Sequence, residues 1–353
     1  MKLKRLIILV MSVTMLVIAD NAQAQKNKYK KRRQTNRRIS HYSGGTRGYG
    51  RFEPYIYVGA AVNAGNYFGD LAPVSKKAST DISFTRPGFG IYGGYKFHHS
   101  MAVRAGLNWV RVFGDDFSAD PGSEGDVARY ARNLSFRNDI KEFQVGLEIY
   151  LLPNYGGPRQ RLPLNAYLFV GAAVFHHEPM GKVPEFDYQL EGVNATTAAP
   201  QAGEWVKLRP LETEGTSYKN IGISIPVSVG AQFRLPGTEF TAGLEFGIRY
   251  LFTDYIDDVS DSYVDLDSFD SDLARIMSDR SAVPVSSTGD ARDLNLLNIQ
   301  QQNGYFRETG IGIGSGTDGA VRGNPDNNDM IFMTQIKLSY VIGGTTRRRA
   351  KYR

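Results

Sequence analysis

Eight segments of the chain alternate between apolar and small or polar residues with the period of two that is typical of β-strands. In the first segment, Ile56, Val58 and Val62 share one face, while small or polar residues occupy the other. Each segment has roughly the 9–11 residues that a tilted membrane strand needs. The predicted strands are Tyr55–Ala64, Gly88–Phe97, Met101–Phe113, Lys141–Leu152, Asn165–Phe175, Ile221–Arg234, Phe240–Phe252 and Met330–Ile342.

The connections between these strands alternate between short and long. Those after the second, fourth and sixth strands are short, whereas those after the first, third, fifth and seventh run about 20, 25, 45 and 75 residues. Outer-membrane barrels have short periplasmic turns and longer outer loops, and a backbone in lipid must satisfy its hydrogen bonds by closing the sheet. The sequence therefore predicts an all-β fold, an eight-stranded antiparallel transmembrane β-barrel over residues 52–342.

The start of the chain has the three parts of a secretion signal. Three basic residues fall within the first five positions, an apolar stretch covers Leu6–Ala19, and a small-x-small pattern follows at Ala22–Ala24. The apolar stretch is shorter than the roughly 20 residues that a spanning helix needs. Residues 1–24 are therefore predicted to be a signal peptide that is cleaved near Gln25, with the mature protein in the outer membrane.

Basic charge is concentrated at the two ends of the mature chain. Lys26–Arg38 holds eight Lys or Arg and Arg347–Arg353 holds five, while the body between them is acidic although the whole chain has a pI near 9.2. We predict a disordered periplasmic tail over residues 25–51 and a second basic periplasmic tail over 343–353. Such asymmetry marks either interaction tails or merely solvated ones. Because the chain is exported, anionic headgroups or an acidic periplasmic protein are the expected partners, and nucleic acid is not.

The predicted inner face of the barrel carries charges of both signs. Isolated charges are costly away from water, and eight strands leave just enough room for side chains. The pattern therefore favours a salt-bridged, plugged lumen over a narrow ion path. The predicted inward charges are Lys96, Arg104, Glu142, Glu148, Arg234, Glu245, Arg249 and Lys337.

The sequence offers little catalytic or cofactor chemistry. With no Cys, disulfides, thiolate metal sites and Cys nucleophiles are excluded. The glycine patterns Gly88–Gly93 and Gly314–Gly319 lack the βαβ context of a dinucleotide site, and the adjacent pairs His98–His99 and His176–His177 make poor metal sites. We predict no enzyme, catalytic residue, cofactor or metal. An outer-membrane lipase or acyltransferase with scattered Ser and His is the alternative.

The stretch Asp254–Asp272 contains eight aspartates. Clustered carboxylates suit calcium, but the spacing is not that of an EF-hand loop. A solvated acidic loop is the favoured interpretation, and calcium binding is the alternative. The following segment, Asp272–Ser278, is predicted to be one short helix.

Three short segments resemble the PorG family, outer-membrane barrels of Bacteroidota that are linked to the type IX secretion system. The most specific is the FTDYIDDVS stretch, and the likeness runs from about Tyr55 to Ile342. The resemblance implies an eight-stranded barrel without catalysis that attaches to periplasmic ring proteins of the secretion machine, with no small-molecule substrate. The alternative is a surface adhesin or ligand-binding barrel that acts through its long outer loops. The three segments are Asn66–Leu71, Arg249–Ser260 and Arg322–Pro325.

Overall fold

The computed structural model describes residues 52–72, 85–119, 127–158, 160–185, 189–190, 193–194, 201–293, 319–325 and 328–342. The predicted signal peptide, both basic tails and most of Gly314–Gly319 lie outside these residues.

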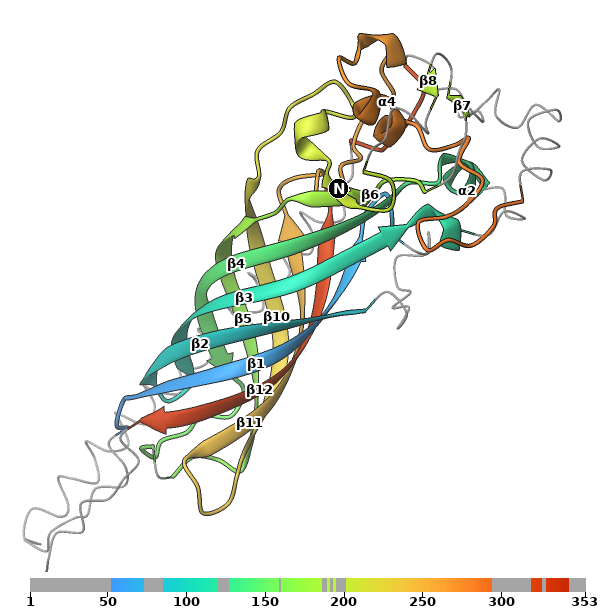
Figure 1. Ribbon diagram of the computed structural model, residues 1–353. Coiled ribbons are helices and arrows are strands. Elements are labelled where there is room, and N and C mark those ends of the chain that lie inside the picture. Colours follow the sequence, from blue (N-terminus) through green and yellow to red (C-terminus); the bar gives the residue numbers. More distant parts are fainter. Residues whose placement is uncertain are drawn as a thin grey trace, which may run out of the picture. The chain divides into compact units, whose positions relative to one another are not determined.

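Eight antiparallel strands close into a barrel (Figure 1). Their order around the wall is β3-β2-β1-β12-β11-β10-β5-β4, and pairing of β3 with β4 closes the ring. The first and last strands are neighbours, and Ile56 pairs with Ile342 at the end that bears the short turns. The predicted fold is therefore confirmed. The barrel strands are β1 Tyr55–Phe68, β2 Arg86–His98, β3 Met101–Asp115, β4 Ser135–Tyr150, β5 Leu164–His176, β10 Ile221–Arg234, β11 Phe240–Leu251 and β12 Met330–Ile342.

The alternation in the sequence reflects a wall with an apolar outside and a polar inside. On β12, for example, Ile336 is 66% exposed while its neighbour Lys337 is buried. Because most large apolar side chains of the barrel face outward, this surface fits hydrocarbon, as in barrels of the outer-membrane type. The outward residues include Ile56, Val62, Phe89, Ile91, Leu107, Phe143, Val174, Ile223, Val229, Phe246, Ile248 and Ile336.

Two irregular features of the sequence are accommodated within strands. The glycine pattern Gly88–Gly93 lies inside β2, so it forms no phosphate-binding turn. Pro226 cannot donate to a neighbouring strand. Accordingly, pairing of β10 with β5 stops at Ser224 and resumes at Val227 without a change of register.

Several strands extend further toward the long loops than predicted. The structure starts β4 at Ser135 rather than Lys141 and continues β1 to Phe68 rather than Ala64. In these extensions the apolar outer face ends, but the hydrogen-bonded ladder goes on as far as the pair Asp115 and Ser135. The alternation in the sequence therefore marks the membrane-facing part of each strand.

The long connections fold into a cap over one end of the barrel (Figure 1). Within it, β6 pairs with β4 and β9 extends the sheet beyond β6. The predicted helix Asp272–Ser278 is confirmed as α4. A separate apolar cluster around Ile276, Met277 and Val283 fills the cap. No helix of the described residues is long and apolar enough to cross a membrane. The cap elements are η2 Asp116–Ser118, α2 Val127–Arg132, β6 Pro179–Lys182, β7 Gln189–Leu190, β8 Val193–Asn194, β9 Trp205–Lys207, η3 Arg209–Leu211, η4 Leu266–Ser268 and α4.

Candidate functional site

Two polar regions of the barrel are candidates for function, and the first is the middle of the lumen. There Arg104 bridges Glu148 and Glu245, with N–O distances of 2.7 Å to each carboxylate. Lys337 lies 2.8 Å from Glu245 and 4.0 Å from Glu148. Four strands supply these four side chains, and the two cations balance the two anions. Buried charges are stable only when paired in this way.

Tyrosine hydroxyls complete this central cluster. Those of Tyr57 and Tyr150 donate to Glu148 at 2.5 and 2.6 Å. The hydroxyl of Tyr167 donates to Glu245 at 2.6 Å. Each carboxylate therefore has several partners from different strands, which ties opposite walls of the barrel together.

A second polar layer lies nearer the cap. The amide of Asn108 donates to Glu142 at 2.9 Å, and that of Gln335 donates to Asn63 at 2.8 Å. The guanidinium of Arg249 lies 3.6 Å from Glu142. Among the described residues, none of its nitrogens has a hydrogen-bond partner. This buried arginine is thus held by charge alone.

The lumen contains little free space toward the short-turn end. Lys96 is buried, with its ammonium 3.7 Å from the ring centroid of Tyr150. Arg234 is only partly buried and donates to the backbone carbonyl of Arg161 at 3.4 Å. Two cavities here have volumes of about 20 Å³ each, room for about one water molecule. The prediction of a filled lumen is confirmed, and that of paired charges is confirmed for six of the eight side chains. Lys96 contacts an aromatic ring instead, and Arg234 lies at the margin.

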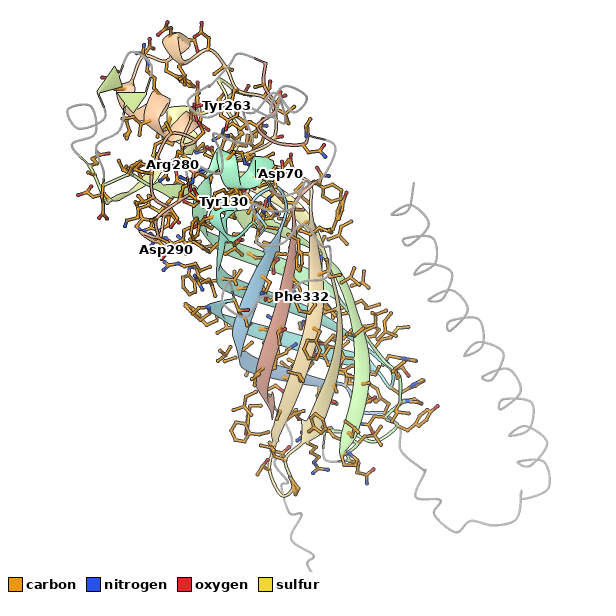
Figure 2. The ribbon with its side chains drawn as sticks, turned by 90° about the vertical axis from the view of Figure 1, so that its right-hand side faces the viewer. Asp70, Tyr130, Tyr263, Arg280, Asp290 and Phe332 are labelled. Carbon is orange, nitrogen blue, oxygen red and sulfur yellow. The ribbon has the colours of Figure 1, made fainter. Side chains whose placement is uncertain are left out.

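The second polar region joins the three segments that resemble the PorG family. The backbone N–H of Leu71 donates to the carboxylate of Asp257 at 3.0 Å. The N–H of Asn324 donates to the carboxylate of Asp70 at 2.6 Å. Figure 2 shows Asp70 in the cap, away from the strand residue Phe332. Segments far apart in the chain therefore form one structural unit, which we call the motif cluster. It comprises Asn66–Leu71, Arg249–Ser260 and Arg322–Pro325.

Tyr67 lies at the centre of the motif cluster, between two buried carboxyl groups. Its hydroxyl is 2.7 Å from Asp257 and 2.5 Å from Asp329. A hydroxyl has one hydrogen to donate, so one of the two carboxyls must itself carry a proton. Burial raises the pKa of both, and that of Asp329 to about 8. Asp257 accepts three hydrogen bonds, from Tyr67, Leu71 and Val259, whereas one oxygen of Asp329 accepts from Ile256 and the other faces only Tyr67. On this hydrogen-bond pattern we assign the proton to Asp329.

The adjacent Asp258 has the left-handed backbone conformation, with φ of 68°. Its carboxylate accepts hydrogen bonds of 2.5 Å from Thr213 and from Tyr218. The guanidinium of Arg322 donates to the backbone carbonyl of Asp258 at 2.6 Å and lies 2.8 Å from Glu214. These contacts hold a strained residue in place, which Asp tolerates better than most residues. The DDVS stretch is thus a folded junction.

The prediction of a solvated acidic loop is wrong for the first part of Asp254–Asp272. Asp254, Asp257 and Asp258 are buried because the motif cluster and the cap enclose them. Burial raises the pKa of Asp254 to about 8. Among the described residues, no three His, Asp or Glu side chains are placed to hold a metal ion, and the calcium alternative gains no support. The remaining aspartates, Asp261, Asp265, Asp267, Asp270 and Asp272, are exposed.

The histidine pairs occupy structural positions. His98 and His99 lie at the short turn between β2 and β3. His176 ends β5, and the ring of the buried His177 bonds to the carbonyl of Lys219 at 3.0 Å. Burial lowers the pKa of His177 to about 4, so this ring is neutral at physiological pH.

Comparisons with known proteins return structures only. No family model matches the chain, and no curated protein matches it. The chain is similar to Ail of Yersinia pestis, crystallised with the heparin analogue sucrose octasulfate, at 8% identity and a TM-score of 0.30, over 82% of this chain and 97% of Ail. It is also similar to Neisserial surface protein A, at 9% identity and a TM-score of 0.33, over 82% and 98%. A major outer membrane protein from Thermus thermophilus matches at 11% identity and a TM-score of 0.37, over 81% and 99%.

Proposed function

We propose that this outer-membrane barrel is a non-enzymatic structural component of the type IX protein secretion machinery, which it anchors by contacting the periplasmic ring. The motif cluster carries the proposal. The three segments that resemble the PorG family are in mutual contact, so the resemblance rests on one folded unit rather than on three separate coincidences. The paired charges in the lumen support an anchoring role over transport.

The proposed contact surface is the short-turn end. β1 begins at Tyr55 and β12 ends at Ile342, and these ends are neighbours in the sheet. The predicted basic tails adjoin both strands in sequence, so both would reach the same compartment. Basic segments attract an acidic partner over a range set by ionic strength. The proposed partners are thus periplasmic ring proteins and outer-membrane lipid.

The test is capture of ring proteins from native membranes by affinity-tagged protein. Full-length protein, a variant without residues 26–38 and 347–353, and a cap variant with Asp265, Asp267 and Asp270 changed to Asn are compared. The proposal predicts that full-length protein and the cap variant capture ring proteins and that the tailless variant captures far less. Capture of no ring protein by the full-length chain would overturn it.

A surface adhesin is the second candidate function. One observation favours it: the long loops form an ordered cap with its own apolar cluster, and this cap presents Asp265, Asp267 and Asp270 to solvent. In this case the triple Asp→Asn variant would lose binding to surfaces while protein secretion stays intact. Loss of secretion with unchanged surface binding in the variant without residues 26–38 and 347–353 would decide for the anchoring role.

A further inference from the structure

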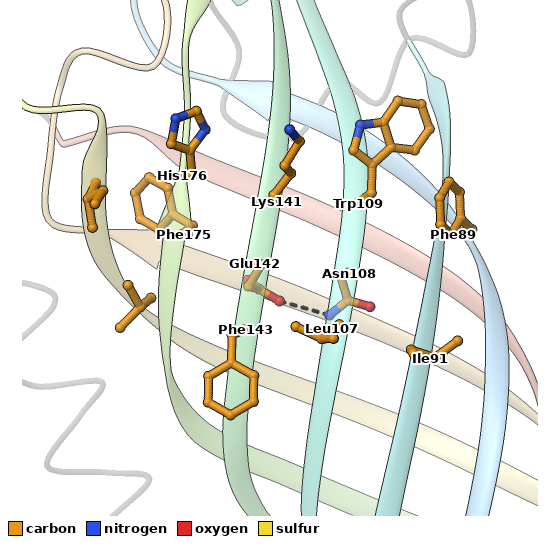
Figure 3. A pocket seen from close by; sticks show the side chains of 12 residues that line it. Phe89, Ile91, Leu107, Asn108, Trp109, Lys141, Glu142, Phe143, Phe175 and His176 are labelled. Atoms are coloured by element: carbon orange, nitrogen blue, oxygen red, sulfur yellow. Dashed lines mark hydrogen bonds between the residues drawn. The ribbon is translucent and has the colours of Figure 1, made fainter.

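A broad apolar groove runs across the outside of the barrel wall. Its cavity has a volume of about 580 Å³ and crosses β2, β3, β4, β5 and β10 (Figure 3). Strand pairing aligns its lining in two rows. The row nearer the cap is Phe89, Trp109, Lys141, His176 and Ile221, and the row below is Ile91, Leu107, Phe143 and Val174. Ile223 pairs with Val174 and continues the lower row beyond the cavity.

The groove is wide enough for several acyl chains side by side. Strands are spaced about 4.8 Å apart, so five strands give a width of roughly 19 Å. Below the two rows, the register places the small residues Gly93, Ala105 and Ala172 on the same outer face, around Val145. Small side chains between larger ones keep the surface recessed. A lipid with multiple chains fits this shape better than a lipid with one.

Lys141 lies at the outer edge of the part of the barrel wall that would face the hydrocarbon layer of the membrane. Every outward residue from Leu151, just after β4, to Phe143 is apolar, and Lys141 is the next outward residue toward the cap. Ten residues at about 3.3 Å each, on a strand tilted by about 45°, rise roughly 23 Å, close to the ~25 Å apolar band of such barrels. Lys141 pairs across the sheet with Trp109, and tryptophan is enriched at this interface. Lysine here extends its ammonium into the headgroup layer.

Lys141 is also free to bind an anion. The next outward cation toward the cap, Arg111, is bound to Asp139 at 2.6 and 2.8 Å. Arg137 lies over the ring of Trp205, at 4.4 Å. Lys141 itself is exposed, and it forms no ion pair with the residues that the structure describes. Figure 3 shows it between His176 and Trp109, directly above Phe143.

We infer that this groove binds a phosphorylated, multiply acylated glycolipid of the outer leaflet, of the lipid A class. The acyl chains lie over the two rows and the small residues below them, and the phosphate binds Lys141. The position near the long loops selects the outer leaflet, because the long loops of such barrels are extracellular. Basic sites at this depth bind anionic headgroups. The inference does not depend on the proposed secretion role.

The test is the amount of glycolipid that stays with the full chain after detergent extraction, measured by native mass spectrometry. Lys141→Gln removes the charge, and Val174→Trp fills the groove. The matched controls are Lys207→Gln on β9 and Ile336→Trp on the opposite wall. Loss of one charge-assisted contact predicts about a tenfold drop in retained lipid for Lys141→Gln, a comparable drop for Val174→Trp, and none for either control.

Reassembly into nanodiscs with defined lipids distinguishes the contribution of the phosphate to binding from that of the acyl chains. Wild type is expected to retain lipid A about tenfold better than dephosphorylated lipid A, and Lys141→Gln is expected to retain both equally. Heat-dependent gel mobility confirms that every variant is folded. The inference is overturned if the groove variants retain as much as wild type, if the controls fall equally, or if the retained lipid is a zwitterionic phospholipid.

Discussion

The shared proton between Asp257 and Asp329 gives the sharpest prediction. Asp329→Asn should be tolerated, because its amide nitrogen replaces the protonated oxygen as a donor to Tyr67 while its oxygen still accepts from Ile256. Asp257→Asn should not, because Asp257 accepts three hydrogen bonds and has no donor role. One buried donor left without a partner costs about 1–3 kcal/mol. We expect Asp257→Asn to lower the free energy of opening the motif cluster by about 1–3 kcal/mol.

The same proton makes the motif cluster sensitive to pH. The pKa of Asp329 is raised from 3.8 to about 8, so the folded state holds a proton that the unfolded state releases. Stability from this group is therefore fully present below about pH 4 and is lost as pH rises through about 8. One proton gives at most about 1.4 kcal/mol per pH unit. Between pH 6 and pH 7.5 the expected loss from this one group is about 2 kcal/mol.

Hydrogen exchange at the amides of Leu71 and Ile256 measures both effects. Protection factors, corrected for intrinsic exchange, should fall roughly 30-fold between pH 6 and pH 7.5 in wild type. The slope should become shallower in Asp329→Asn, where Asp254, whose pKa is also raised to about 8, still contributes. Protection should be low at every pH in Asp257→Asn. Flat protection in wild type, or equal losses in the two variants, would refute the assignment of the proton.

Three further predictions concern the lumen and the cap. Arg104→Met should destabilise the barrel by about 3–5 kcal/mol, because Lys337 alone would remain to balance the two buried carboxylates Glu148 and Glu245. Urea unfolding in vesicles measures this, and a loss below about 1 kcal/mol would contradict it. Wild-type protein in planar bilayers should give no steady conductance, since the lumen is filled; a stable open channel would disprove this. Gly323→Ala should loosen the cap, because a Cβ there would lie 2.5 Å from the backbone nitrogen of Ser260; limited proteolysis should show faster cleavage, and an unchanged rate would count against the close packing.

Much of the barrel could be predicted from the sequence because lipid imposes the same rule on every strand. Alternation in Tyr55–Ala64 or Lys141–Leu152 directly encodes which side chains meet hydrocarbon. The inward charges follow from the same parity. The alternation does not predict which inward charges pair, because the contact of Arg104 with Glu245 depends on which strands face each other across the lumen.

The motif cluster and the groove could not be predicted from the sequence, for a related reason. Asp257 and Asp258 looked solvated because their partners, Tyr67 and Thr213, lie far away in the chain. The resemblance drew attention to the right segments without indicating that they touch. The groove exists only once the register has aligned residues from five strands. Local patterns predict elements, whereas sites made by distant segments require the fold.

A closed barrel in the outer membrane should hold its short turns in the periplasm and its long loops outside the cell. The chain has no Cys, so single cysteines can be labelled in intact cells with a membrane-impermeant maleimide. Asp270→Cys in the cap should react at once, Pro236→Cys in a short turn only after the membrane is permeabilised, and Ile336→Cys on the lipid face in neither case. Labelling of Pro236→Cys or Ile336→Cys in intact cells would contradict the account.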